Sequence, residues 1–174
     1  GTTALNANQW YHVAVSGTAG SSIKMFLNGT QEGSTYTGNI TDASTALLIG
    51  QIASSNWFTG YMSNLRIIKG TALYTSNFTP PTSPLTAVSN TVLLTCQSNR
   101  FVDNAATPNT ITATGGTAIT PFSPFAPTQS YSASAVGGSG YFDGSGDYLS
   151  VADNAAFTMG TGDFTVEYWV YWNG

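Results

Sequence analysis

Two aspartates flank a glycine-rich loop near the carboxyl end of the chain. Asp143 and Asp147 are separated by Gly144-Ser145-Gly146. Calcium takes oxygen ligands from loops of this kind, so the pair is a candidate metal site with calcium as its ion. The alternative is a tight hairpin turn between Phe142 and Tyr148, because Asp and Gly also supply turn geometry. The spacing is not that of an EF-hand loop.

Asp163 and Glu167 form a second pair of carboxylates, on an apolar segment that is expected to be a strand. Alternate residues of a strand share a face, but positions i and i+4 are about 13 Å apart by rise alone. A retaining glycosidase needs two carboxyl groups about 5 Å apart. We therefore predict that Asp163 opens the strand, that Glu167 is a solvated or edge side chain, and that the chain has no catalytic residues.

His12 and Cys96 are the single histidine and the single cysteine. One cysteine excludes an internal disulfide and a cysteine-based zinc site. One histidine without a nucleophile beside it gives no argument for a Ser–His–Asp arrangement. Both are predicted to be structural.

Asn56 and Trp57 are the candidate ligand-binding residues. They follow a polar stretch, Ala53-Ser54-Ser55, which suggests a loop. An indole beside an amide suits a sugar, which presents an apolar C–H face and a rim of hydroxyl groups. The alternative is that Trp57 or Phe58 closes one end of the fold.

Short apolar segments with a period of two must position these residues. Turn residues separate them, Asn28-Gly29 among others, and helical periodicity is nearly absent. The expected strands cover residues 10–15, 23–27, 46–49, 60–68, 91–95, 111–113, 117–119, 141–142, 148–151 and 164–172. This pattern predicts an all-β antiparallel sandwich or jelly roll.

The composition excludes several classes of partner. Charged residues make up 7% of the 174 residues, and four Lys/Arg against eight Asp/Glu give a net charge of −4. Four scattered bases cannot form a nucleic-acid surface. No apolar run reaches the roughly 18 residues of a membrane helix, so membrane insertion is not expected. A neutral surface of Ser, Thr, Asn and Gly suits a repetitive extracellular or virion protein.

Three segments together resemble the second half of a laminin G-like jelly roll of the concanavalin A-like lectin/glucanase superfamily. They are Trp10–Val15, Lys24–Gly29 and Phe58–Ile67. Gly140–Val151 and Gly162–Tyr171 resemble the first half. Residues 72–81 and 93–104 are similar to tandem repeats in virion structural proteins of marine tailed phages, cyanophages especially. The Glu-x-Asp-x-x-Glu pattern of the glucanase branch is missing, while calcium does occur in laminin G-like domains.

The order of the two halves is reversed relative to the family. We therefore expect a C-terminal jelly-roll half in residues 1–81, a Pro/Ser/Thr linker in 82–90 and an N-terminal half in 91–174. One interpretation is that these residues span the boundary between two consecutive repeats of a longer fibre-like chain. The other is a circularly permuted unit whose halves close on each other.

The resemblance implies a structural repeat of a virion appendage or extracellular fibre, with a glycan-binding or host-attachment role. Its partners would be neighbouring copies of the same protein and cell-surface glycans. The alternative is a ligand-free spacer or filament subunit assembled by strand complementation. A glycoside hydrolase is disfavoured by the missing carboxylate pattern.

Overall fold

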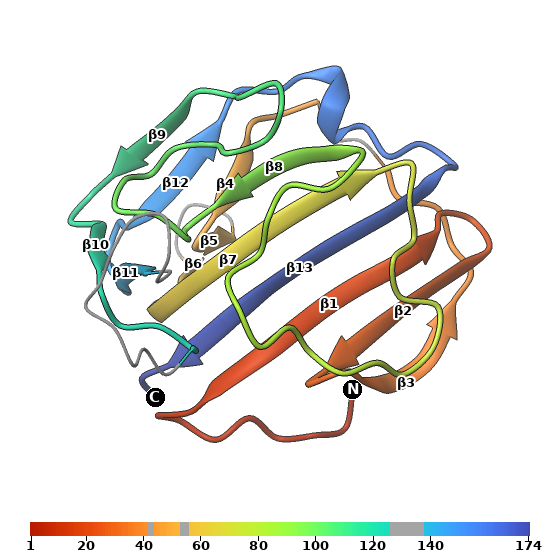
Figure 1. The fold of residues 1–174 in the computed structure, drawn as a ribbon, viewed down its shortest axis with the longest axis horizontal. Coiled ribbons are helices and arrows are strands. Elements are labelled where there is room, and N and C mark those ends of the chain that lie inside the picture. Colours follow the sequence, from red (N-terminus) through yellow and green to blue (C-terminus); the bar gives the residue numbers. More distant parts are fainter. Residues whose placement is uncertain (42–43, 53–55, 126–137) are drawn as a thin grey trace.

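The computed structural model describes residues 1–41, 44–52, 56–125 and 138–174. It is built almost entirely from antiparallel strands, which confirms the predicted all-β sandwich. One large sheet has the strand order β10-β11-β7-β13-β1-β2-β3, and β8 pairs with the far half of β7 (Figure 1). A three-stranded sheet, β4-β12-β9, and a short hairpin, β5-β6, complete the described structure.

The strands of the large sheet come from both ends of the chain. They are β1 (Trp10–Thr18), β2 (Ser22–Leu27), β3 (Thr30–Tyr36), β7 (Thr59–Lys69), β8 (Thr91–Thr95), β10 (Ala118–Thr120), β11 (Ser139–Asp143) and β13 (Asp163–Trp172). The remaining elements are β4 (Leu47–Ile49), β5 (Gln51–Ile52), β6 (Asn56–Trp57), β9 (Ile111–Thr114), β12 (Tyr148–Val151) and a 3₁₀ turn at Ala155–Phe157.

Strand β13 lies at the centre of the large sheet. It pairs with β1 on one side, where Val15 faces Val166, and with β7 on the other, where Ile67 faces Val166. Strands of residues 1–81 and of 91–174 therefore share one sheet. Two faces result, which we call inner and outer; the inner face carries Ile67 and Val166, and the outer face carries Arg66 and Glu167.

The inner face packs against the small sheet and forms the main core. Leu65, Ile67 and Leu93 of the large sheet meet Leu149 and Val151 of the small one, and all five are buried. Burial of such side chains is the dominant favourable term in folding. The small sheet has three strands and the large sheet has eight, so the small sheet covers only part of the inner face.

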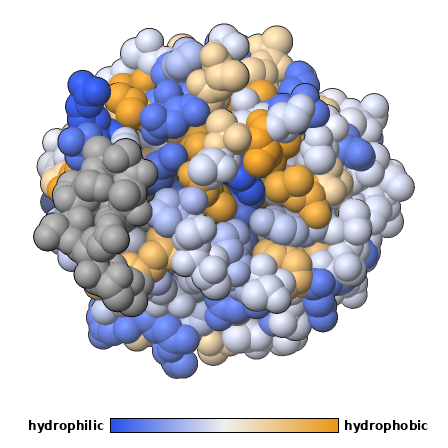
Figure 2. Space-filling view, in the orientation of Figure 1, coloured by the Kyte–Doolittle hydropathy of each residue, from blue (hydrophilic) through white to orange (hydrophobic). Residues whose placement is uncertain are grey.

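The outer face carries the segment 70–90, which crosses β13, β1 and β2 in Figure 1. Within this segment, Leu85 is buried, and its backbone N–H donates to Asn64 Oδ1 at 2.7 Å. The carbonyl of Thr86, also in the segment, accepts a hydrogen bond from Arg66. Residues 82–90, predicted as a linker, thus run along the sheet. Figure 2 shows this face as scattered hydrophobic residues between pale and hydrophilic ones.

Every predicted strand segment overlaps a strand of the structure, and the predicted starts at residues 46 and 117 are one residue early. Strands β3, β5 and β6 were not predicted. Strand β3 is an edge strand of mostly exposed polar residues, and β5 and β6 have two residues each. None of the three has the apolar alternation on which the prediction rested. Over the described ranges, no helix is long and apolar enough to span a membrane.

The Asn28-Gly29 pair forms the predicted turn between β2 and β3. Asn28 has φ of 48° and Gly29 has φ of 78°, both in the left-handed region that a type I′ hairpin requires. The Gly29 carbonyl accepts from Phe78 N at 2.9 Å, so the turn also anchors the segment 70–90. A Cβ at Gly29 would collide with the carbonyl oxygen of Phe78.

Gly29→Ala is expected to lower the free energy of unfolding by about 2 kcal/mol or more, from left-handed strain plus this collision. Gly146→Ala is the matched control, because Gly146 has φ of 79° and open space around its Cβ position. It should cost only about 1 kcal/mol of strain. Urea denaturation measures both, and equal losses would contradict the role of the Phe78 contact.

Candidate functional site

Trp57 and Asn56 form β6, which pairs with β5 in a short hairpin. Gln51 faces Trp57, Ile52 faces Asn56, and Phe58 N donates to the Gly50 carbonyl at 2.8 Å. Trp57 is half-buried rather than part of an open loop, and Asn56 is exposed. Residues 53–55, the polar stretch noted in the sequence, lie outside the described part. Phe58 packs on the core, with its ring 6.1 Å from that of Phe142.

A hollow of about 490 Å³ opens beside this hairpin. Its size falls within the roughly 300–1,000 Å³ of small-molecule sites. The residues around it are Leu48, Gly50, Gln51, Ile52, Asn56, Trp57, Phe58, Met62 and Tyr168. None carries a charge, and they combine aromatic rings with two side-chain amides. The hollow, which we call the Trp57 hollow, therefore suits a neutral ligand with apolar faces and hydroxyl groups.

The indole N–H of Trp57 has no hydrogen-bond partner among the described residues, although it is shielded from solvent. The Asn56 side chain beside it is exposed, and that of Gln51 is partly exposed. A shielded donor left unpaired costs about 1–3 kcal/mol.

Asp143 and Asp147 bond to the backbone of their own loop and its neighbour. Asp147 is buried; its Oδ1 accepts from Gly116 N, and its Oδ2 accepts from Asp143 N at 2.9 Å. Asp143 Oδ1 accepts from Ser145 N at 2.7 Å. In the described ranges, no three of the His, Cys, Asp and Glu side chains gather as a metal site would require. Calcium at this loop stays a prediction.

The hairpin interpretation of this loop is wrong. Strand β11, before the loop, belongs to the large sheet, while β12, after it, belongs to the small sheet. The loop therefore carries the chain from one layer of the sandwich to the other. Asp147 ties this crossing to the turn at Gly116, between β9 and β10.

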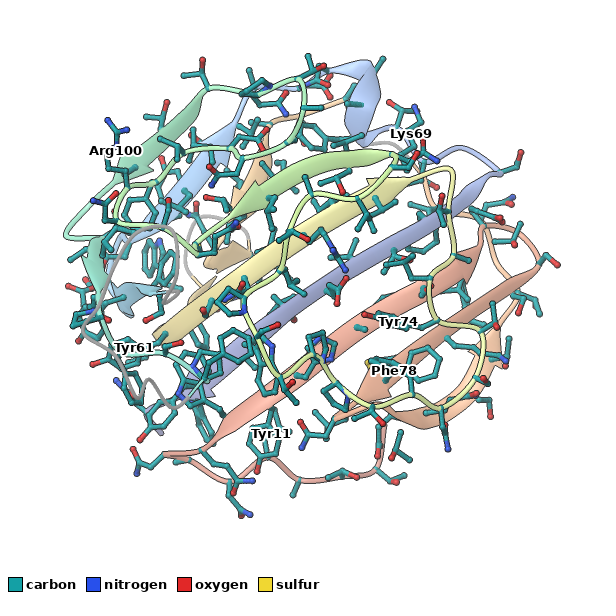
Figure 3. The ribbon with its side chains drawn as sticks, viewed as in Figure 1. Tyr11, Tyr61, Lys69, Tyr74, Phe78 and Arg100 are labelled. Atoms are coloured by element: carbon teal, nitrogen blue, oxygen red, sulfur yellow. The ribbon has the colours of Figure 1, made fainter. Side chains whose placement is uncertain are left out.

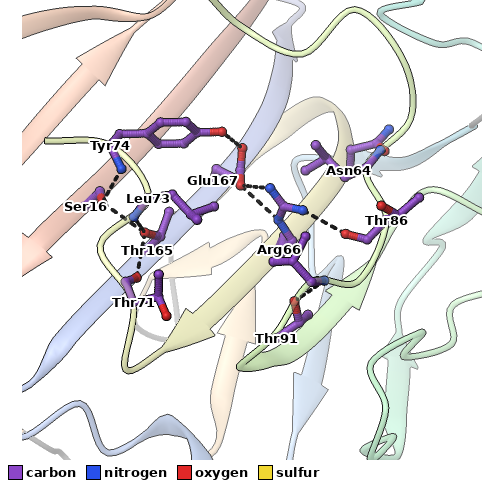
Figure 4. A network of polar contacts seen from close by, with 12 residues as sticks. Ser16, Asn64, Arg66, Thr71, Leu73, Tyr74, Thr86, Thr91, Thr165 and Glu167 are labelled. Atoms are coloured by element: carbon purple, nitrogen blue, oxygen red, sulfur yellow. Dashed lines mark hydrogen bonds and ion pairs between the residues drawn. The ribbon is translucent and has the colours of Figure 1, made fainter. Parts of the chain in front are cut away.

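Glu167 is fully buried, and its carboxylate has four hydrogen-bond contacts, from three side chains. Arg66 donates from Nε at 2.9 Å and from Nη2 at 2.6 Å to Oε1. His12 Nε2 lies 3.2 Å from Oε2. The Tyr74 hydroxyl donates to the same oxygen at 2.8 Å (Figure 4). The four residues come from β13, β7, β1 and the segment 70–90.

The prediction that Glu167 is a solvated or edge side chain is therefore wrong. Strand β13 is flanked by β1 and β7, and the segment 70–90 covers its outer face, so Glu167 has no path to water. Asp163 does open the strand as predicted: it is exposed and accepts from the Thr18 hydroxyl at 2.6 Å. One sequence signal was available, since Arg66 and Glu167 are rare charges inside strongly apolar strands.

Electrostatics around Glu167 favour its charged form. Burial alone would raise its pKa, but the hydrogen bond from His12 and the charge and hydrogen bonds of Arg66, together with Tyr74, leave the pKa of Glu167 below its ordinary value. The pKa of Tyr74 rises well above its ordinary value, through burial and then the negative charge of Glu167. The cluster is a buried ion pair of Arg66 and Glu167, and His12 and Tyr74 bond to the same carboxylate.

A second row of polar contacts clamps the segment 70–90 beside Glu167. Ser16 and Thr165 share a hydrogen bond of 2.9 Å; Thr165 Oγ1 accepts from Leu73 N, and Ser16 Oγ accepts from Tyr74 N. The Tyr74 and Phe78 rings lie stacked with centroids 3.6 Å apart, over β1 and β2 (Figure 3). His12 meets Phe78 and Trp169 edge-on.

Cys96 and His12 both lie in the interior of the protein. Both are fully buried, and burial raises the pKa of the Cys96 thiol to about 12. Cys96 follows β8 with a φ of 59° and packs in the inter-sheet core.

Comparison with known protein families identifies part of the chain. Residues 1–74 match the laminin G-like family model of the concanavalin A-like lectin/glucanases superfamily. The resemblance is thereby confirmed for this segment, which contains β1 to β7, Arg66 and every residue that lines the Trp57 hollow except Tyr168. Searches of curated proteins and of solved structures found no match. A carbohydrate-binding or structural role follows at the level of the superfamily.

Glu167→Gln is expected to lower the free energy of unfolding by about 3–5 kcal/mol, because the buried Arg66 guanidinium loses its counter-charge. Asp163→Asn, on the same strand but exposed, should change it by less than about 1 kcal/mol. If Glu167→Gln does not fold, Tyr74→Phe removes one donor and should cost about 1–3 kcal/mol. The cluster does not stabilise the fold if Glu167→Gln and Tyr74→Phe both lower the free energy of unfolding by no more than Asp163→Asn does.

Acid should weaken the protein through the same carboxylate. A carboxylate whose pKa is lower in the folded than in the unfolded state stabilises the fold at neutral pH, and that contribution is lost as the pH falls through the folded-state pKa. Urea denaturation at a series of pH values from neutral to acidic measures the decline. It should be smaller in Glu167→Gln than in the wild type, and parallel curves would contradict the assignment.

Proposed function

We propose that this chain is a non-catalytic, glycan-binding structural module of an extracellular or virion fibre. The Trp57 hollow is the observation that carries the proposal. It combines the Trp57 and Tyr168 rings with the side-chain amides of Gln51 and Asn56. Aromatic faces stack on sugar C–H groups and amides bond to hydroxyl groups, so both halves of the recognition chemistry are present.

The absence of acid chemistry at the hollow supports binding rather than hydrolysis. Glycoside hydrolysis needs a pair of carboxyl groups at the scissile bond. None of the residues around the hollow is a carboxylate, and the buried Glu167 is saturated by four hydrogen bonds elsewhere. The proposal also needs no calcium at the hollow, because no carboxylate lies in its lining to balance the charge of the ion.

The low charge of the chain supports a fibre with many weak sites. With 7% charged residues, affinity for a glycan must come from stacking and neutral hydrogen bonds. Neighbouring copies on one fibre would raise the overall avidity through their effective concentration. The virion assignment rests on the similarity of residues 72–81 and 93–104 to phage repeats, with cell-surface glycans as the partner.

A glycan array followed by titration calorimetry on the best glycan tests the proposal. Trp57→Ala should weaken binding by about tenfold or more, since loss of one stacked ring is worth about 1–2 kcal/mol. Trp172→Ala is the matched control, because Trp172 is 40% exposed and lies outside the hollow. EDTA should leave binding unchanged. No bound glycan for the wild type, or equal affinity for Trp57→Ala, would overturn the proposal.

A further inference from the structure

An apolar trough continues from the Trp57 hollow along the inner face of the large sheet. It has a volume of about 400 Å³ and shares Phe58, Met62 and Tyr168 with the hollow. Its floor is the part of the inner face that the small sheet leaves uncovered. Val13, Leu27 and Val170 lie there on the neighbouring strands β1, β2 and β13.

The chemistry changes along this continuous surface. At the hairpin end, Gln51, Asn56 and Trp57 offer hydrogen bonds and a ring. Beyond Tyr168, the lining is dominated by aliphatic and methionine side chains. A ligand that fills both parts must be polar at one end and apolar at the other.

A charged side chain at the apolar end of the trough further restricts the class of ligand that fits there. Glu32 is the one charged side chain of the trough lining, and its oxygens accept from Thr2 N at 2.9 Å and from the Thr3 hydroxyl at 2.6 Å. These bonds hold the pKa of Glu32 below its ordinary value, so the carboxylate is ionised at neutral pH. A negative charge there repels an anionic tail and leaves a neutral hydrocarbon chain as the fitting occupant.

We propose that the Trp57 hollow and the trough together bind an acylated saccharide, with the sugar at Trp57 and a neutral hydrocarbon chain along Val13, Leu27 and Val170. This rests on the proposed function and names its ligand class as a glycolipid. A β-strand of another copy is the competing occupant. It is less favoured because both open strand edges near the site are poor partners: β4, beside the Trp57 hollow, offers only Leu47–Ile49, and β3, which reaches the trough at Glu32, is mostly polar and exposed.

Methyl and octyl β-glycosides of glucose, galactose and N-acetylglucosamine test the inference, each used below its micellar concentration on residues 1–174. The octyl glycoside should bind at least about tenfold more tightly than the methyl glycoside, because burying two methylenes already supplies that factor. Trp57→Ala should weaken both. Octan-1-ol is the tail-only probe, and circular dichroism confirms that each protein stays folded.

Met25→Lys separates the two parts of the site. Met25 lines the trough and is 38% exposed, so lysine is tolerated there. This variant should lose the octyl advantage and keep the methyl glycoside affinity. Leu73→Lys is the matched control, because Leu73 is also 38% exposed but belongs to the segment on the outer face. It should behave as the wild type.

The outcomes distinguish the inference from the proposed function. Equal binding of methyl and octyl glycosides, both lost in Trp57→Ala, would overturn the inference and leave the glycan site standing. Octan-1-ol binding as tightly as the octyl glycoside would overturn the inference, because the sugar would add nothing. No glycoside binding, with self-association in sedimentation velocity that Met25→Lys abolishes, would assign the trough to a second copy and overturn both.

Discussion

The buried carboxylate of Glu167 is the interaction on which the outer half of the structure depends. A charge in the middle of an apolar strand cannot remain unpaired, because its desolvation would cost several kcal/mol. Arg66 from β7 and His12 from β1 meet it from the two neighbouring strands, and Tyr74 meets it from above. The register of three strands and the path of the segment 70–90 are therefore constrained at a single point.

The two faces of the large sheet have different organisation. The outer face is covered by the segment 70–90 and not by a second sheet. Hydrogen bonds to Ser16 and Thr165 and the stacked rings of Tyr74 and Phe78 hold this segment on the face. The inner face is conventional where the small sheet covers Leu65 and Ile67, and open where that sheet ends. Both the Trp57 hollow and the trough lie at this boundary, so the candidate site results from the unequal size of the two sheets.

Much of the fold was predictable because its signal is local. Apolar alternation located each long strand, and Asn28-Gly29 located a hairpin, since both depend on residues adjacent in sequence. Strand β3 and the hairpin β5-β6 escaped because polar edge strands and two-residue strands have no such alternation. The sequence identified the glycine-rich loop between Asp143 and Asp147. That this loop crosses from one sheet to the other depends on which strands pair on either side of it, and the local sequence does not show this.

Asn56 and Trp57 could be singled out from their residue types alone, and the scarcity of Lys and Arg and the lack of the Glu-x-Asp-x-x-Glu pattern are visible in the sequence itself. The sequence by itself thus determined the all-β class, the strand positions and the neutral character of the surface, because each is a property of composition or short-range pattern. Only the tertiary structure decided that Glu167 is buried, that Gln51 and Tyr168 join Trp57, and that the hollow opens into a trough. These facts depend on contacts between residues up to 155 positions apart, which no local pattern encodes.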